Sequence, residues 1–136
     1  MDQQTITHVQ STWKSVEAIA PQAAELFYDN LFVADPSLKD LFKGDMTAQG
    51  KKLMQMIGAA VGKLNDLDTL VPILQSLGVR HASYGVKEPH YGTVGSALLK
   101  TLEQGLGPSF TPDVKQAWVT VYQTMANVMI EAARPA

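Results

Sequence analysis

His81 is the residue in this sequence whose surroundings most suggest chemistry. It lies on a helical stripe whose other members are apolar or aromatic and recur at steps of three or four residues: Leu70, Leu74, Leu77 and Tyr84. Such a stripe predicts a buried helix face. A histidine on a buried face needs a partner for its ring nitrogens, either a hydrogen-bonding group or a metal. A hydrogen-bonded core histidine is the commoner case, and a metal ligand is the alternative.

Gln49 interrupts a second apolar row in the same way, ahead of Leu53, Met56, Ala60 and Leu64. The helix from Gln49 to Leu64 would be about 22 Å long, and the one from Thr69 to His81 ~18 Å. If the two helices fold back on the turn between them, Gln49 and His81 reach similar heights on facing walls. The space between these walls is apolar and suits a flat, apolar ligand with a metal at its centre, which describes haem.

The elements that must position these residues are all predicted to be helical. A first helix begins near Thr5 as its N-cap, and Pro21 starts a second. After a short turn at 38–42 and an irregular connection at 43–47, a helix covers 48–64 and Asp68 caps the next. The remaining helix boundaries are predicted at Gly85, which ends this helix, at Gly107-Pro108, which end the following helix, and at Thr111-Pro112, which start the last. No segment alternates at period two and none repeats, so the sequence predicts an all-α domain over residues 1–136 with six or seven elements.

The composition excludes several classes of protein. The net charge of -2 gives no basic surface for nucleic acid or an anionic membrane, and no apolar run reaches the ~18 residues of a membrane span. With no cysteine in the chain, disulfides, thiolate metal sites and covalent haem attachment are excluded. The N-terminus does not resemble a signal peptide. We expect a cytoplasmic protein, a monomer or a weak homodimer.

Blocks spread over the whole chain carry a family resemblance. They lie at 26–32, 36–42, 77–81, 85–86, 90–91 and 117–122, and both the blocks and the distances between them resemble bacterial single-domain globins. Similar proteins are the Vitreoscilla-type haemoglobins, the globin part of flavohaemoglobins, and neuroglobin. The resemblance implies the globin fold, a three-over-three helical sandwich, and haem b as cofactor.

The resemblance also implies a role for each matching position. His81 matches the histidine that binds iron, and Phe42 the phenylalanine that packs on the haem plane. Tyr28 and Gln49 match the residues that act on the gas ligand on the opposite, distal side, and Leu53 lies one turn beyond Gln49. Lys52 and Arg80 fall where basic side chains meet the haem propionates. The lining of the proximal side and rim is assigned to Leu77, Val86, Tyr91, Val94 and Leu98.

Elementary chemistry adds physical content to these roles. The Leu77 carbonyl lies four residues before His81 and can accept a hydrogen bond from the outer ring N–H, which fixes the ring. The Tyr28 hydroxyl and Gln49 amide can donate to oxygen, which predicts high oxygen affinity. One departure concerns the last helix, where the flavohaemoglobin pattern has a glutamate acting together with the tyrosine matched by Tyr91. Ala133 stands there, which predicts an incomplete proximal relay.

Several functions stay open on the sequence. The first is oxygen binding with nitric oxide dioxygenation, which requires a separate electron-donating reductase. The second is oxygen storage or delivery without turnover, and the third is gas sensing; dioxygen, nitric oxide and carbon monoxide are the expected ligands. The fourth is a globin-like scaffold without haem, in which His81 is structural. Enzymatic activity therefore remains an open question at this stage.

Each functional role has a purely structural alternative. Tyr28 could be a core residue bonded to backbone, Gln49 could turn to solvent, and Lys52 could be a solvated charge. His8 and His90 are expected at the surface, and Trp13 and Trp118 in the core. The three histidines are too scattered for a zinc site.

Overall fold

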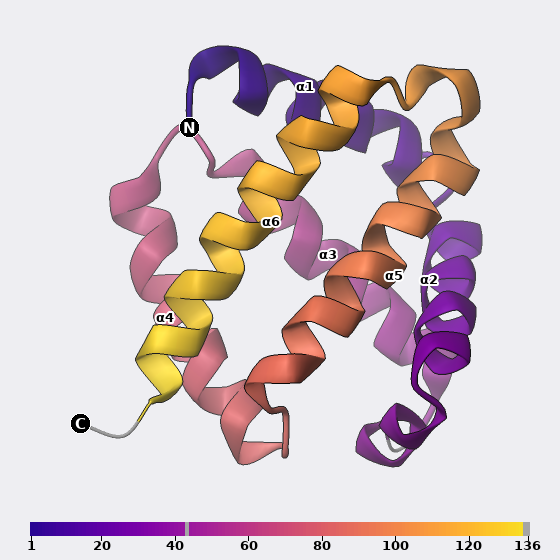
Figure 1. Ribbon diagram of the computed structural model, residues 1–136, viewed down its shortest axis with the longest axis vertical. Coiled ribbons are helices and arrows are strands. Elements are labelled where there is room, and N and C mark those ends of the chain that lie inside the picture. Colours follow the sequence, from indigo (N-terminus) through magenta and orange to yellow (C-terminus); the bar gives the residue numbers. More distant parts are fainter. Residues whose placement is uncertain (43, 135–136) are drawn as a thin grey trace.

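The computed structural model describes residues 1–42 and 44–134, and the described chain is helical without strands (Figure 1). Its elements in chain order are α1 (Gln3–Glu17), α2 (Ala20–Ala34), the 3₁₀ helix η1 (Pro36–Leu41), α3 (Met46–Gly62), α4 (Leu67–Ser83), α5 (Glu88–Leu106), the 3₁₀ helix η2 (Gly107–Ser109) and α6 (Pro112–Ala133). The predicted all-α fold class is confirmed. Of the predicted irregular connection at 43–47, Lys43 lies outside the described residues, and α3 already begins at Met46.

Side-chain caps fix where most of these helices begin. The Thr111 hydroxyl accepts from the Val114 amide at 3.3 Å, as the sequence predicts for α6. Two predicted caps are wrong. Asp2, not Thr5, caps α1 by accepting from the Thr5 amide at 2.8 Å, and Asp66, not Asp68, caps α4. In both cases an acidic side chain two or three residues upstream takes the free N–H groups first, which lengthens the helix.

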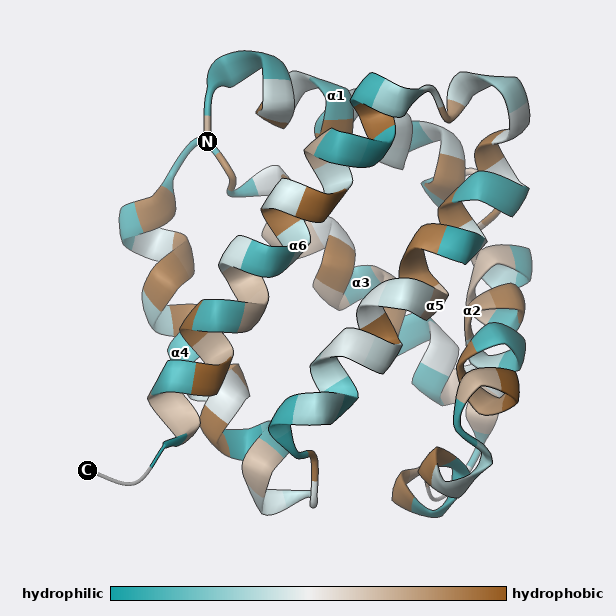
Figure 2. Ribbon diagram, viewed as in Figure 1, coloured by the Kyte–Doolittle hydropathy of each residue, from teal (hydrophilic) through white to brown (hydrophobic). Residues whose placement is uncertain are grey.

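The helices pack in two layers, with α5 and α6 in front of α3 and with α2 and α4 on opposite sides (Figure 1). The main packing pairs are α4 with α6, α2 with α5, α1 with α6, and α2 with α3. Apolar and polar residues are interleaved along every helix (Figure 2), as amphipathic helices require. The largest fully buried side chains form the centre of the core: Trp118, Leu31, Leu64, Leu70, Leu102, Val9 and Val121. No helix in residues 1–42 and 44–134 is both long and apolar enough to cross a membrane.

Two glycines let the helices cross α6 closely. A Cβ on Gly78 would overlap the Met129 carbonyl, and one on Gly95 would lie 2.7 Å from the Tyr122 ring. Because neither glycine carries a Cβ, α4 reaches the backbone of α6 at Gly78, and α5 accommodates the Tyr122 ring of α6 at Gly95. The first crossing lies one turn before His81, so it fixes the height of that histidine in the fold.

The sequence predicts that α3 and α4 face each other across an apolar space, and in the structure they are not closely packed on each other. α4 packs on α6, whereas α3 packs on α2 and α1, and the two helices are not a main packing pair. The predicted burial of Tyr84 is wrong, since its side chain is 64% exposed. Tyr84 is the C-cap of α4 and precedes Gly85, whose φ of +95° turns the chain away from the helix axis.

Candidate functional site

His81 lies in the last turn of α4, and its ring is held in one orientation. Nδ1 lies 2.7 Å from the Leu77 carbonyl oxygen, and since a carbonyl only accepts, Nδ1 carries the proton and donates. Nε2 is then the nitrogen with the free lone pair. It makes no hydrogen bond with any residue that the structure describes. The hydrogen bond therefore holds the ring in one orientation, in which Nε2 is the nitrogen left to bind a metal.

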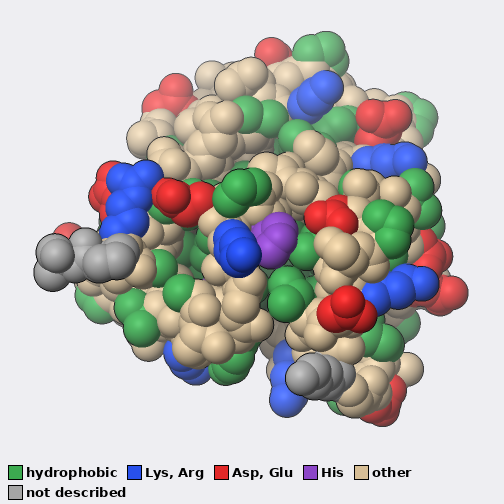
Figure 3. All heavy atoms as spheres, turned by 60° about the horizontal axis from the view of Figure 1, so that its bottom comes forward, with side chains coloured by type: hydrophobic (Ala, Val, Ile, Leu, Met, Phe, Trp, Pro, Cys, Tyr) green, Lys and Arg blue, Asp and Glu red, His purple; other side chains and the backbone are tan. Residues whose placement is uncertain are grey.

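Several apolar side chains on or next to η1 and on α3, α4, α5 and α6 are only half-buried, although they pack against the core. This half-buried set contains Leu41, Phe42, Leu53, Ile57, Leu77, Val94, Met125 and Met129. A space-filling view of the lower face shows a histidine near its centre, between a basic and an acidic side chain, with a few apolar side chains close by (Figure 3). These side chains are therefore less completely covered than those at the centre of the core.

Tyr28 lies in an aromatic cluster on α2 and η1. Its ring centroid is 5.3 Å from that of Phe42 and 5.9 Å from that of Phe32. The side chain is 8% exposed, and its hydroxyl makes no hydrogen bond with the described residues. Burial raises the pKa of Tyr28 to about 12, so the phenol keeps its proton at neutral pH and can donate.

A close crossing of α2 and α3 places Gln49 beside this tyrosine. A Cβ on Gly50 would lie 3.0 Å from the Ala24 Cβ and 3.9 Å from Cε2 of Tyr28. Gln49, the preceding residue, is half-buried in the first turn of α3, and Leu53 is half-buried one turn later. The structure therefore brings Tyr28, Gln49 and Leu53 to one region.

The edge of the site joins η1 to the loop after α4. Cδ2 of Leu41 lies 3.4 Å from the position of a Cβ on Gly85. Lys52 and Arg80 are exposed, and neither forms an ion pair with a residue in the described ranges. Both basic groups are available for an anionic partner.

Tyr91, Val86, Val94 and Leu98 follow on the other side of His81. The Val86 amide donates to the His81 carbonyl at 3.0 Å, and the Tyr122 hydroxyl donates to the Tyr91 carbonyl at 2.6 Å. Burial raises the pKa of Tyr91, and it also raises the pKa of Tyr122. The first bond holds the loop before α5 to the end of α4, and the second ties α5 to α6.

A pocket of about 190 Å³ adjoins Tyr91 where the sequence predicts a missing carboxylate. Ala133 lines it together with Tyr91, and the lining residues include no carboxylate from the described part of α6. Glu88 at its border accepts from Arg134 at 2.8 Å. The arrangement agrees with the interpretation that Ala133 leaves a gap beside Tyr91.

The chemistry of the donor set decides which metal group fits. No three His, Asp or Glu side chains gather as ligands for a bare ion anywhere in the described ranges. A single preoriented imidazole beside half-buried apolar side chains instead fits an iron that is already held by a porphyrin. His81 could bind that iron, and the half-buried set could cover the ring.

The sequence reasoning missed two features of the structure. His90 is partly exposed at the start of α5, and its Nδ1 accepts from the Lys87 amide at 3.0 Å and so caps this helix. The signal was its place three residues after Lys87 at a helix start. Trp13 is in the core as predicted, but its Nε1 is buried without a hydrogen-bond partner in the described structure, which composition does not reveal.

Comparisons with known proteins agree with this geometry. The sequence pattern of the Globin family matches residues 25–129. The chain is 32% identical to the Neuroglobin of Danio rerio, over 89% of this chain and 85% of that protein. It is also 32% identical to a Flavohemoprotein of Bacillus subtilis (strain 168), over 96% of this chain, which spans only 33% of that longer protein.

A solved structure supports the same fold. A bacterial globin from Campylobacter jejuni superposes with a TM-score of 0.83 and covers 97% of this chain and 96% of its own, at 24% identity. This likeness shows the fold, and it agrees with the three-over-three sandwich predicted from the sequence.

Proposed function

Because the chain belongs to the globin family, whose members bind haem and small gas ligands, we propose a specific role for it. The protein is an oxygen-binding globin of high affinity. In this proposal His81 supplies the iron ligand and Tyr28 and Gln49 face the gas. The absence of cysteine from the sequence favours haem b, held without thioether bonds.

The observation that carries the proposal is the state of the His81 ring. Its Nδ1 donates to Leu77 at 2.7 Å, and its Nε2 has no partner in the described structure. A hydrogen bond of this kind fixes the tautomer and raises the basicity of the other nitrogen. The haem plane would be covered by seven apolar or aromatic side chains: Phe42, Leu53, Leu77, Val86, Tyr91, Val94 and Leu98. Lys52 and Arg80 would meet the haem propionates.

Tyr28 and Gln49 would determine how long the gas stays. Haem, when bound, supplies an iron that binds dioxygen and exchanges electrons. The Tyr28 phenol is neutral, buried and without a hydrogen-bond partner in the described structure, so it can donate to a ligand that carries partial negative charge. Such a bond contributes about 1–3 kcal/mol, or roughly 5- to 150-fold in retention.

Nitric oxide dioxygenation is the turnover that this site would support. Nitric oxide and dioxygen combine to nitrate, and each cycle leaves the protein one electron short. A separate reductase would return that electron, and the likeness to one third of a Flavohemoprotein supports such a partner. The gap at Ala133 beside Tyr91 favours the second candidate, oxygen storage, delivery or sensing without turnover, because no carboxylate of α6 polarises the proximal side.

Visible absorption and stopped-flow kinetics test the proposal. The purified protein should show haem bands that shift on reduction and on addition of carbon monoxide. Tyr28→Phe should speed oxygen dissociation at least about fivefold, while Tyr84→Phe, the same change at an exposed position, should leave it unchanged. An unchanged rate for Tyr28→Phe would exclude its hydroxyl from gas binding. A colourless protein that does not take up hemin would overturn the proposal as a whole.

A further inference from the structure

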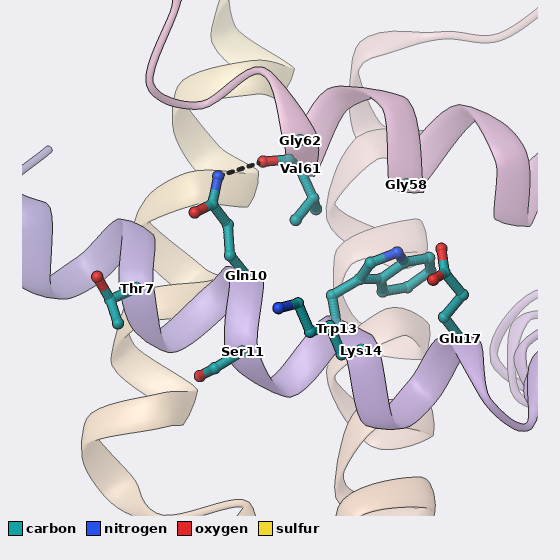
Figure 4. Close-up of a pocket in the computed structure, with 9 residues that line it drawn as sticks. All are labelled: Thr7, Gln10, Ser11, Trp13, Lys14, Glu17, Gly58, Val61 and Gly62. Carbon is teal, nitrogen blue, oxygen red and sulfur yellow. Dashed lines mark hydrogen bonds between the residues drawn. The ribbon is translucent and has the colours of Figure 1, made fainter.

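A groove of about 400 Å³ lies between α1 and α3, on residues that the haem site does not use (Figure 4). Its α1 wall presents polar side chains and Trp13, and its α3 wall presents two glycines one turn apart, Gly58 and Gly62. Small residues alone do not make a binding site. The groups that border Gly58 supply the further observation.

Gly58 leaves a notch between a donor and an acceptor. A Cβ at this position would lie 3.2 Å from Nε1 of Trp13 and 3.5 Å from Oε2 of Glu17. In Figure 4 the indole nitrogen and the Glu17 carboxylate lie next to each other at the α3 side of the groove. One small group at the notch can therefore reach both.

The indole N–H of Trp13 is the polar group that needs a partner. Trp13 is only 4% exposed, and its Nε1 makes no hydrogen bond in the described structure. The neighbouring Trp118, whose ring centroid is 6.2 Å away, does have a partner, since its Nε1 donates to the Thr12 hydroxyl at 2.9 Å. An unpaired buried N–H is unusual in a native protein and points to an acceptor from outside the chain.

The other groups of the groove do not supply this acceptor. Gln10 donates to the Val61 carbonyl at 2.9 Å (Figure 4) and to Asn65 at 3.0 Å. Glu17 makes no hydrogen bond or ion pair with any described residue, and its side chain is exposed. Its carboxylate is therefore available to accept a hydrogen bond from a ligand at the notch.

We propose that this notch binds a primary carboxamide. The amide carbonyl accepts from Trp13 Nε1, and the amide NH₂ donates to the Glu17 carboxylate. A carboxylate ligand could satisfy the indole but would face the Glu17 charge, and an ammonium ion could pair with Glu17 but would leave the indole unpaired. A carboxamide satisfies both groups and carries no charge.

Two sources share this chemistry: a free small amide, and the glutamine side chain of a protein partner. Acetamide and a doubly capped glutamine distinguish them. Binding of either supports the notch, and binding of the capped glutamine alone assigns it to a protein partner. The three-ligand series of acetamide, acetate and methylammonium tests the hydrogen-bond pattern itself.

The experiment follows the two indole N–H signals of the full-length, ¹⁵N-labelled protein in its diamagnetic carbonmonoxy form. Acetamide should shift the Trp13 signal saturably, with a dissociation constant on the order of 10 mM, as expected for so small a ligand. The Trp118 signal, already hydrogen-bonded, is the internal control and should stay in place. Acetate and methylammonium should not produce this saturable shift.

Two variants test the geometry. Gly58→Ala places a methyl group in the notch and should weaken acetamide binding at least about tenfold, and Glu17→Leu removes the acceptor at an exposed position with a similar effect. Gly92→Ala is the matched control, since a Cβ there meets nothing within 4 Å. The proposal fails if neither amide shifts the Trp13 signal, if all three small ligands shift it equally, or if Glu17→Leu binds acetamide as before. None of these outcomes bears on oxygen binding.

Discussion

The fully buried core side chains and the half-buried side chains near His81 are equally apolar, but only the first set is covered by protein. Leu102 and Val121 have no exposed surface, and Trp118 has 1%. Leu53, Leu77 and Val94 pack against this core and yet remain partly open. The difference lies in the surroundings of the side chains and not in their types.

The two sets also differ in how the helices that carry them pack. Gly78 and Gly95 bring α4 and α5 close to α6 at the points where they cross it. α3 instead packs on α2 and α1, away from α4. Clustered, partly exposed apolar side chains are typical of a ligand site. In the proposed function, haem would cover these side chains.

Removal of the His81 imidazole should have the largest effect, which is a loss of haem affinity. His81→Ala leaves the half-buried set in place but deletes the only histidine that we assign to the iron, so haem affinity should fall at least about 100-fold. The measurement is hemin titration followed by visible absorption. His90→Ala is the matched control, because His90 caps α5 and is assigned no iron. Stoichiometric haem with unchanged spectra in His81→Ala would contradict the assignment.

Truncation of one leucine in the fully buried core and one in the half-buried set should lower the free energy of unfolding by different amounts. Leu102→Ala should lower the free energy of unfolding of the haem-free protein by about 3–5 kcal/mol, because the side chain is fully buried. Leu77→Ala should cost about 1 kcal/mol or less in the haem-free protein, and more once haem covers the site. Urea unfolding with and without haem measures both. Equal losses in the haem-free protein would show that the two regions do not differ as described.

The tyrosines of the two regions predict the smallest effect, at alkaline pH. Burial raises the pKa of Tyr28 from 10.0 to about 12, so between these values the folded protein keeps a proton that the unfolded chain releases. The contribution of Tyr28, roughly 2–3 kcal/mol, is fully present below pH 10 and is lost as the pH rises through about 12.

Tyr28→Phe should therefore make the free energy of unfolding less dependent on pH between about 10 and 12. Part of the dependence should remain, because burial also raises the pKa of Tyr122. Chemical unfolding of the haem-free protein at several pH values measures the slope, with Tyr84→Phe at an exposed position as control. A steeper slope in Tyr28→Phe would show that the sign is wrong.

The predictions from the sequence succeeded where the interactions are local. The hydrogen bond from His81 to Leu77 spans four residues, the cap at Thr111 spans three, and the left-handed turn at Gly85 needs one glycine. The predicted caps at Thr5 and Asp68 are wrong because aspartates close by compete for the same N–H groups. Periodicity placed Tyr84 on a buried stripe, but the stripe continues beyond the point where α4 ends and the chain turns away.

The sequence by itself determined the helices, their order and the ring orientation of His81, because these depend on groups within about one helical turn. The tertiary structure was needed to show that α4 packs mainly on α6. It was also needed to show that the indole N–H of Trp13 is unpaired in the described structure beside Gly58. Both results depend on which distant residues lack a side chain at a crossing. The periodicity of one helix does not indicate where the helix packed against it has a glycine in place of a larger side chain.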